Sequence, residues 1–375
     1  MDLKQLRRAV ADDLAQLPTA AFEGLPTVMG FDGFVDNIID VVDTRSARDA
    51  YSPLATIADF GARITRAAGH SANFELVVKQ TKIGGNGPIM ANALAALGHA
   101  VSYIGILGEG QLDPAFQPLA ERAAAVYSLG NPASTDALEF RDGKLMFGKL
   151  EPLEQVSVEN LRSVVGEDRL LQLFSAANCV ATVNWTMLLS MNEIWDYLMA
   201  EILPRLTSSQ RPRWFVDLAD PAKRSREDLR QALQTLGKLQ AHADIILGLN
   251  EAETRQVLEV CGSSWEGLSE DLGMAETSCR YLREHLGLSR VVCHMVKGAA
   301  GASKDESAGV EGFFEPHPKI TTGAGDHFNA GYLWAIAAGQ CERSALLIGT
   351  ATSGHYVRTT HSPTKEDLIT LLSAS

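Results

Sequence analysis

The chain has 375 residues, of which 46% are hydrophobic, and its 33 Lys and Arg against 46 Asp and Glu leave a formal net charge of −13 at pH 7. This is the composition of an ordinary globular protein that is long enough to bury a large core. The acidic balance argues against a general nucleic-acid binder and against a protein of anionic membrane surfaces, because both need a cationic surface.

The sequence shows neither a signal peptide nor a membrane-spanning segment. Residues 1–18 interrupt their apolar spacing with acids and have no apolar segment typical of a signal peptide. No apolar run approaches the about 18 residues of a membrane span. The five cysteines are widely spaced without a C-x-x-C pair, which argues against a disulfide framework and a zinc site. We therefore expect a cytoplasmic protein with no membrane and no nucleic-acid partner.

Short apolar runs alternate with longer helical stretches along the chain. Most of the runs are continuously apolar, which suits strands that are buried on both faces of a parallel sheet. Helical spacing occurs between them, for example at 88–97 and 227–239. The pattern predicts a doubly wound, mostly parallel α/β sheet flanked by helices, and the absence of repeats and long linkers predicts one domain over residues 1–375. The apolar runs lie at 26–31, 101–108, 179–184, 214–219, 243–250 and 290–296.

Two stretches depart from this pattern and predict a second, smaller sheet. Residues 74–83 alternate in part, and residues 137–149 have two β-like arms around the turn dipeptide Asp142-Gly143. We interpret them as a small antiparallel lid, which excludes water from the reaction site that it covers. The alternative is that the hairpin lies at the edge of the main sheet. If the segments do form a lid, its open strand edges predict a homodimer through the lid. The lid segments are expected near 32–45, 72–84 and 135–150.

The most informative run is TTGAGDHFNAG at 321–331, which precedes a helix-like apolar stretch. The backbone N–H groups of Gly323, Ala324 and Gly325 can approach an anion closely, and the helix N-terminus adds a positive dipole. Asp326 can accept a proton from a hydroxyl group while this loop stabilises charge on a transferring phosphoryl group. The arrangement predicts a small-molecule kinase, and a glycine turn before a capped helix is the alternative.

This run resembles the C-terminal signature of the ribokinase-like (PfkB) carbohydrate kinases, D-T-T-G-A-G-D-x-F-x-x-G, and the resemblance extends over residues 27–365. It implies a ribokinase-like fold and an ATP- and Mg²⁺-dependent transfer to a hydroxymethyl group of a sugar, sugar acid or nucleoside. It assigns Asp326 as the catalytic base and Gly323, Ala324 and Gly325 as the anion hole. The alternatives are a kinase of pyridoxal or hydroxymethylpyrimidine, and a catalytically weak sugar- or nucleotide-sensing protein on the same fold.

The same resemblance places the acceptor site on two segments. Gly84, Gly85 and Asn86 resemble the glycine pair of the sugar site, and the acids of FDGFVD follow the first predicted strand, where the family has a sugar-binding Asp. Asp36 is the first choice and Asp32 the second, because a carboxylate there can accept hydrogen bonds from two adjacent hydroxyl groups. Ordinary turn acids at a strand end are the alternative.

Three segments resemble the nucleotide and metal contacts of the family. Asn250 and Glu253 match an N-x-x-E motif that organises Mg²⁺ through water, and the same pattern also suits a helix N-cap. Lys297 and Gly298 resemble a strand-turn below the nucleotide, where Lys297 contacts either phosphate or solvent. Thr322 of the signature is assigned to nucleotide binding.

The chain departs from the family pattern at two positions. Ile320 replaces the Asp that begins the signature and that the resemblance assigns to a monovalent-cation site, so the resemblance does not extend to potassium activation. Ile89 replaces an Asn after the glycine pair, which alters the expected sugar contacts. His327, beside the base, is interpreted as a packing or surface residue. Asp217 and Asp220 end another strand at the edge that faces the ligand, where they either reach the metal or cap the next helix.

Motifs of other enzyme classes are absent. The sequence has no P-loop G-x-x-x-x-G-K-[ST], no G-x-G-x-x-G after the first strand and no G-x-S-x-G. P-loop kinases, simple NAD dehydrogenases and α/β-hydrolases are therefore disfavoured. Lys82 and Lys149, near the lid, are weak candidates for a basic residue that assists the transfer.

Overall fold

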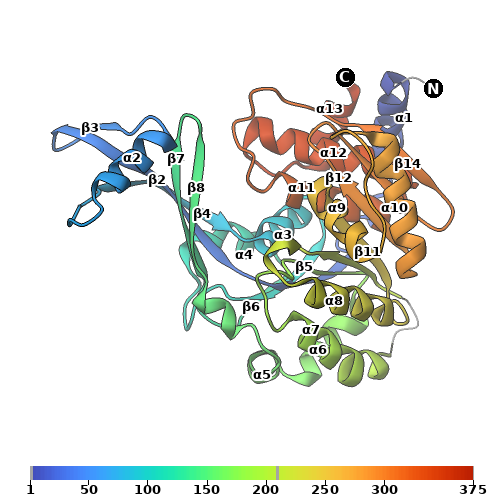
Figure 1. The fold of residues 1–375 in the computed structure, drawn as a ribbon. Coiled ribbons are helices and arrows are strands. Elements are labelled where there is room, and N and C mark those ends of the chain that lie inside the picture. The colour runs from blue at the N-terminus through green and yellow to red at the C-terminus, as the bar shows by residue number, and fades with distance from the viewer. Residues whose placement is uncertain (1–2, 208–210, 375) are drawn as a thin grey trace.

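The computed structural model describes residues 3–207 and 211–374, and it shows a large sheet covered by helices with a smaller sheet projecting from it (Figure 1). Within these residues the large sheet has nine strands in the order β14-β13-β12-β11-β10-β9-β1-β5-β6. All pairs from β6 to β12 are parallel, and only β13 and β14 at one edge run antiparallel to their neighbours. The predicted doubly wound, mostly parallel sheet is confirmed. The strands are β1 Pro26–Phe31, β5 Ala100–Gly105, β6 Ala125–Ser128, β9 Cys179–Thr182, β10 Arg213–Asp217, β11 Asp244–Asn250, β12 Arg290–His294, β13 Gly298–Ala302 and β14 Ser307–Glu311.

The helices cover both faces of this sheet, and each face has its own hydrophobic cluster. One cluster packs the sheet against α6 Glu167–Ala176, α7 Met191–Tyr197, α8 Arg226–Leu239, α9 Glu251–Val260 and α10 Leu272–Leu286. The other packs it against α1 Leu3–Gln16, α3 Asn86–Ala96, α4 Gln117–Arg122, α11 Ala324–Ala337, α12 Glu342–Thr359 and α13 Lys365–Ser373. In Figure 1 α6 to α8 lie on the opposite side of the sheet from α1, α12 and α13. The continuously apolar strands are explained by this burial on both faces.

Helix α11 is buried almost all round, unlike an ordinary surface helix. Its residues 326–336 are all buried, because α11 lies against α12 and α3 as well as against the sheet. Gly331 allows the close approach, since a Cβ atom there would lie 2.1 Å from the hydroxyl oxygen of Thr352 on α12. A helix packed from several sides holds its N-terminus in a fixed position, which matters for the residues described below.

The smaller sheet together with α2 Ile57–Arg66 is called the lid here. Its strand order is β3-β2-β7-β8, with β4 also paired to β2, so the β7–β8 hairpin belongs to this sheet and is no edge of the large one. Ile39, Val41 and Leu138 form its small core with Phe60 of α2. The lid strands are β2 Phe34–Ala47, β3 Ala50–Pro53, β4 Leu76–Gly84, β7 Ala133–Phe140 and β8 Gly143–Lys149.

One strand pair of the lid differs from the antiparallel arrangement expected from the sequence. Strands β2 and β7 are parallel, while the other lid pairs are antiparallel. The reason is that β2 follows β1 and β7 follows β6, so both leave parallel strands of the large sheet in the same direction. In the described part of the chain, no helix is both long and apolar enough to cross a membrane.

Candidate active site

Gly323 forms the turn that starts helix α11. It is the N-cap residue and adopts a left-handed conformation, with φ of 90°. A Cβ atom at this position would come within 3.2 Å of Ile89 and 3.3 Å of the Tyr356 hydroxyl oxygen. Both the backbone conformation and the space therefore require glycine.

The backbone of this turn presents free hydrogen-bond donors. The Ala324 N–H group donates to the Thr321 carbonyl oxygen at 3.2 Å, whereas those of Gly325 and Asp326 contact no acceptor among the described residues. Free N–H groups at a helix N-terminus bind anions, because the helix dipole adds positive potential there. Of the anion hole expected at Gly323, Ala324 and Gly325, the N–H group of Gly325 is free and that of Ala324 is engaged, and the role of these residues stays a prediction.

Asp326 lies in the first turn of α11, beside these donors. Its side chain is buried, with 7% exposure, and its Oδ1 accepts a hydrogen bond of 2.9 Å from the Asn86 side chain at the start of α3. Burial raises the pKa of Asp326 well above its ordinary value, the Asp217 carboxylate raises it further, and the Asn86 hydrogen bond opposes both. Cations brought by bound ligands would favour the ionised form.

Buried acids surround Asp326 on several sides. Asp217, Glu253 and Asp32 are each at most 6% exposed, and all three act electrostatically on Asp326. Burial and then repulsion by Glu253 raise the pKa of Asp217 to about 8, and burial raises the pKa of Glu253. Buried carboxyl groups that repel one another favour a divalent cation, since its charge relieves the repulsion.

Hydrogen bonds to the backbone fix the orientation of two of these acids. Asp217 ends β10 and accepts bonds of 2.7 Å from the Ala219 N–H group and from the Asn329 side chain of α11. Glu253 forms a capping box with Asn250, the N-cap residue of α9, and also accepts from the Asp220 N–H group at 2.9 Å. Both oxygens of Glu253 thus accept backbone hydrogen bonds, so contact with a metal through water suits it better than direct ligation.

The donor set fits hydrated Mg²⁺ rather than an ion enclosed by protein ligands. Within residues 3–207 and 211–374, no group of three or more His, Cys, Asp and Glu side chains is arranged to hold a metal ion. The amide oxygens of Asn184 and Asn329 are buried without a hydrogen-bond partner. Mg²⁺ keeps several waters and usually binds through one or two carboxylates together with substrate phosphates. The Asp220 side chain is directed elsewhere, since it pairs with Lys223 at 3.3 Å.

Asp36 lies on β2 of the lid and is 5% exposed. Its neighbours across the sheet are Lys82 on β4 and Thr135 on β7. Burial raises the pKa of Asp36, and the charge of Lys82 and the Thr135 hydroxyl group oppose this rise. Gly84 lies directly against the acid, because a Cβ atom there would approach the Asp36 carboxyl carbon to 2.5 Å. Asp36 and Gly84, both expected at the acceptor site, are therefore in contact.

Asp32 has a different environment from Asp36. It is fully buried and accepts hydrogen bonds from the Asn86 N–H group at 3.0 Å and from the Asn184 side chain at 2.7 Å. Burial raises its pKa to about 6, and the Asn184 hydrogen bond opposes the rise. Gly85 precedes Asn86 with φ of 89° and brings the start of α3 onto this carboxylate. Asp32 therefore positions Asn86, whereas Asp36 is buried between the two neighbouring strands of the lid.

A lysine of the lid contacts the loop that precedes helix α11. The Lys144 ammonium group on β8 donates a hydrogen bond of 2.5 Å to the hydroxyl oxygen of Thr322, which precedes Gly323. Thr322 thus faces the lid. Lys149, at the other end of β8, pairs instead with Asp136 at 2.6 Å.

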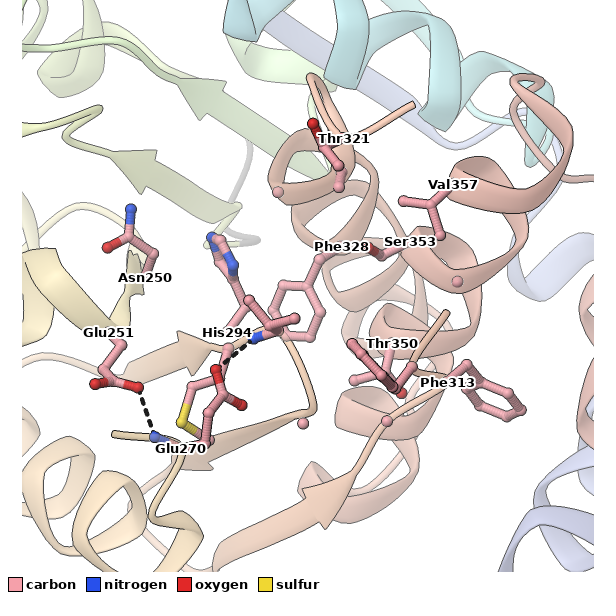
Figure 2. Close-up of a pocket in the computed structure, with 18 of the residues that line it drawn as sticks. Asn250, Glu251, Glu270, His294, Phe313, Thr321, Phe328, Thr350, Ser353 and Val357 are labelled. Atoms are coloured by element: carbon pink, nitrogen blue, oxygen red, sulfur yellow. Dashed lines mark hydrogen bonds between the residues drawn. The ribbon is translucent and has the colours of Figure 1, made fainter. Parts of the chain in front are cut away.

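A cavity of about 580 Å³ lies between the start of α9, the β12–β13 turn and helices α11 and α12 (Figure 2). Figure 2 shows Asn250 and Glu251 on one side of it and Thr321, Ser353 and Val357 on the other. Of the residues expected to bind nucleotide, the metal or phosphate, Asn250, Gly298, Ala324 and Gly325 line this cavity. Lys297 does not line it: the Lys297 side chain is exposed and its ammonium group lies 5.7 Å from the ring centroid of Phe314.

A second cavity, of about 930 Å³, lies under the lid. Residues of β4, the β7–β8 hairpin and the loop before α11 line it, and Pro318 and Thr321 line both cavities. Gly325 lines the first cavity and His327 lines the second. Asp326 lies between these two residues in the sequence, so its backbone is next to both cavities, although its buried side chain lines neither.

His327 has a packing role beside the candidate base. Its ring stacks on Tyr356 with a centroid distance of 3.6 Å. Its Nδ1 lies 2.7 Å from the Gly323 carbonyl oxygen and its Nε2 lies 2.9 Å from the Ser362 hydroxyl oxygen. The Nδ1 contact supports the turn before α11, and the Nε2 contact joins α11 to the segment between α12 and α13. This agrees with the interpretation of His327 as a packing residue.

Several residues of the site were not identified from the sequence. Asn184 and Asn329 orient the carboxylates of Asp32 and Asp217. His294 ends β12, lines the first cavity and lies 3.0 Å from the position of a Cβ atom on Gly325. Asn184 ends the predicted apolar run 179–184 and His294 lies near the end of the run 290–296, and polar residues at the carboxyl edge of a parallel sheet are a usable signal. Asn329 gave no such signal, because it lies inside a helix.

Three comparisons place the chain among known proteins. The sequence profile of the family described as prokaryotic ketohexokinase matches residues 2–374. A ketohexokinase of Haloferax volcanii is 29% identical over 362 residues, which cover 96% of this chain and 93% of that protein. The fold is similar to that of a carbohydrate kinase from Agrobacterium tumefaciens, with a TM-score of 0.59, 18% identity and coverage of 93% of this chain and 97% of that one. It is also similar to Arabidopsis thaliana ribokinase complexed with ribose and ATP, with a TM-score of 0.61, 17% identity and coverage of 94% and 100%.

Proposed function

Because this chain belongs to the prokaryotic ketohexokinase family, it is a carbohydrate kinase, and we propose that it transfers the γ-phosphoryl group of ATP to a hydroxymethyl group of a ketohexose with Asp326 as the base. The observation that carries this proposal is the position of Asp326. It is a buried acid at a helix N-terminus with free N–H groups, and its neighbours in the sequence, Gly325 and His327, line a nucleotide-sized cavity and the cavity under the lid. Family membership favours a sugar acceptor over pyridoxal and favours catalysis over sensing alone.

The acceptor is held on the lid side of Asp326. Asp36 accepts hydrogen bonds from adjacent hydroxyl groups of the sugar, and Gly84 leaves room beside this carboxylate. Asn86 orients the Asp326 carboxyl group at 2.9 Å. A hydroxyl group held next to Asp326 reacts as if at high local concentration, since its translational freedom is already lost.

The transfer itself needs a base and a site for negative charge. Asp326 takes the proton as the hydroxyl oxygen attacks the γ-phosphorus in line, and the bond to the β-phosphate oxygen breaks. The free N–H groups of Gly325 and Asp326, which follow the turn at Gly323 and Ala324, stabilise the charge that develops on the transferring group. Closure of the lid, with Lys144 bonded to Thr322, excludes water that would otherwise hydrolyse ATP.

Nucleotide and metal are assigned to the other side of Asp326. Asn250, Glu253 and Asp217 would hold Mg²⁺, largely through water, and Gly298 would lie below the nucleotide. When bound, Mg²⁺ neutralises charge on the phosphates of ATP. Ile320 lines the lid cavity and offers no oxygen ligand, so we expect turnover without a requirement for potassium.

We also propose that two copies pair through the lid. Strands β4 and β8 each have one unpaired edge in the described chain, which allows further strand pairing. Leu76 and Val78 on β4 and Phe147 on β8 are at least 45% exposed. Light scattering coupled to size exclusion should give a dimer mass, and Val78→Lys should give a monomer.

Phosphoryl transfer by the purified protein tests the proposed reaction. ADP release should be followed with ATP and Mg²⁺ and with ketohexoses, aldoses, sugar acids, nucleosides and pyridoxal in turn. We expect turnover with a ketohexose. Turnover with pyridoxal or a nucleoside alone would contradict the assignment.

A further inference from the structure

The cavity between α9, the β12–β13 turn, α11 and α12, called the nucleotide cavity here, has one wall without regular secondary structure. This wall segment is residues 312–315, which follow strand β14, form neither helix nor strand and all line the cavity. In Figure 2 Phe313 lies across the cavity from Glu251. The Gly312 N–H group donates to the Lys297 carbonyl oxygen at 2.8 Å, which continues the pairing of β14 with β13 by one step. Side chains from other elements hold the rest of the wall segment.

Two arginines from opposite ends of the chain bind the carbonyl oxygens of the wall segment. Arg7 of helix α1 donates to the Gly312 oxygen at 2.8 Å. Arg358 of helix α12 donates to the Phe313 oxygen at 3.0 Å and to the Phe314 oxygen at 2.8 Å. Three consecutive carbonyl groups thus accept hydrogen bonds from guanidinium groups. The planar guanidinium group suits this task, because its donors have fixed directions and can hold several acceptors at once.

Arg7 also contacts the aromatic side chain of the wall segment, although its position there is costly. Its Cζ atom lies 4.2 Å from the ring centroid of Phe313, which is a cation–π distance. Burial lowers the pKa of Arg7, and the charge of Glu311 opposes this. The Arg7 Nε atom is buried and has no hydrogen-bond partner in the described part of the chain. A buried donor without a partner lowers stability, so stability alone does not explain why Arg7 is directed at the wall segment.

Helix α1 has other contacts that hold it on the protein. Val10, Ala11 and Leu14 are buried on one face of α1. This helix packs against α13, and the two lie side by side in Figure 1. Arg7 reaches from α1 to Gly312, which is 305 positions away in the sequence. The apolar face therefore anchors α1, and Arg7 is available to act on the nucleotide cavity.

We propose that Arg7, together with Arg358, is a positioning residue of the nucleotide site, and that it holds residues 312–315 where they contact the bound nucleotide. The inference rests on the proposed function for the assignment of ATP to this cavity. It goes further by making helix α1 part of the nucleotide site. A wall that is already ordered loses little freedom when the nucleotide binds. Arg7 therefore acts on nucleotide affinity and leaves the chemical step at Asp326 unchanged.

Substitution of Arg7 in the whole protein tests this inference. Calorimetry gives the dissociation constant of a non-hydrolysable ATP analogue with Mg²⁺, and ADP release with D-fructose gives kcat and the KM of ATP. We expect Arg7→Gln to raise the dissociation constant and the KM of ATP about fivefold to tenfold, while kcat and the KM of D-fructose change less than about twofold. A purely structural role would lower the thermal stability of the variant and leave these constants unchanged.

A matched control and a second variant complete the experiment. Arg8→Gln removes the same charge from an exposed position of the same helix, so nucleotide affinity should not change. Arg7→Lys keeps the charge but not the planar group, so it should weaken binding about twofold to threefold, and it serves as the test if Arg7→Gln does not fold. Wild-type affinity in the Arg7 variants that fold, or an equal loss in Arg8→Gln, would overturn the inference. The proposed kinase function would still stand in that case if the wild-type protein releases ADP with D-fructose.

Discussion

Replacement of Asp326 by Asn removes the candidate base with little change in shape. The Asn side chain keeps an oxygen that accepts the hydrogen bond from Asn86, so the start of α11 should stay in place. A general base contributes about 10²- to 10⁴-fold to a rate, which corresponds to about 2.7 to 5.4 kcal/mol of transition-state free energy. We expect a loss near the upper value, because the oxygens of Asp217 and Asp32 already accept protein hydrogen bonds and neither acid can substitute.

The assay for this variant separates chemistry from binding. ADP release should fall by the factor above, while the KM of the ketose and the affinity for ATP change by less than about threefold. Asp244→Asn is the matched control. Asp244 lies at the amino end of strand β11, whereas the candidate site lies at the carboxyl ends of the strands, and it pairs with Arg211 on the surface. Thermal unfolding should show that the Asp326 variant folds. A kcat within about threefold of the wild-type value would refute the role of Asp326 as the base.

Three further outcomes follow from the same geometry. Gly84→Ala should raise the KM of the acceptor at least about tenfold in ADP-release assays, because its Cβ atom would meet the Asp36 carboxylate at 2.5 Å. Asp217 has a pKa of about 8 in the folded state, and its ordinary value is 3.8. The stability that Asp217 gives to the folded state is therefore complete below pH 3.8 and is lost as the pH rises to 8. Asp217→Asn should therefore reduce the fall in the free energy of unfolding between pH 5 and pH 8, measured by denaturant without Mg²⁺. Lys144→Met removes a hydrogen bond to the anion-hole loop worth about 0.5 to 1.5 kcal/mol, so hydrogen exchange in the lid hairpin should become faster and kcat/KM should fall.

Each of these outcomes has a control. Gly61→Ala, in helix α2 with open space around it, should leave the kinetics unchanged and stabilise the helix by about 0.5 to 1 kcal/mol. An unaltered acceptor KM in Gly84→Ala would show that Asp36 does not bind the sugar. The same pH dependence of unfolding in wild type and Asp217→Asn would contradict the raised pKa. Unchanged exchange in Lys144→Met would show that its hydrogen bond does not hold the lid.

The large sheet was predictable from the sequence because its signal is local. Strands such as β9, Cys179–Thr182, are buried at every position and therefore read as continuous apolar runs. The lid was harder to derive. Its segments were expected from the sequence. The parallel pairing of β2 with β7, however, depends on the direction in which both strands leave the large sheet, and the alternation of residues along one strand does not indicate this direction.

The candidate site divides in the same way. The glycine turn before α11 and the first-turn position of Asp326 were evident in the sequence, because a glycine turn and a helix N-terminus are made by neighbouring residues. The Asn250 and Glu253 pair was equally local, and the structure shows that it is also a capping box. Local chemistry could not decide between metal binding and capping, since both use the same side-chain oxygens.

Sequence by itself therefore determined the parallel sheet, the glycine turn of α11 and the acid that follows it, because each depends on residues a few positions apart. Tertiary structure alone decided the surroundings of the two acids, since the start of α3 donates a hydrogen bond to Asp32 and Asp36 lies beside Lys82 in the lid. It also placed Asn86 against Asp326, 240 residues away, and Arg7 of α1 against the wall of the nucleotide cavity. Such contacts join distant segments through packing of the whole fold, and the spacing of residues along the chain contains no record of them.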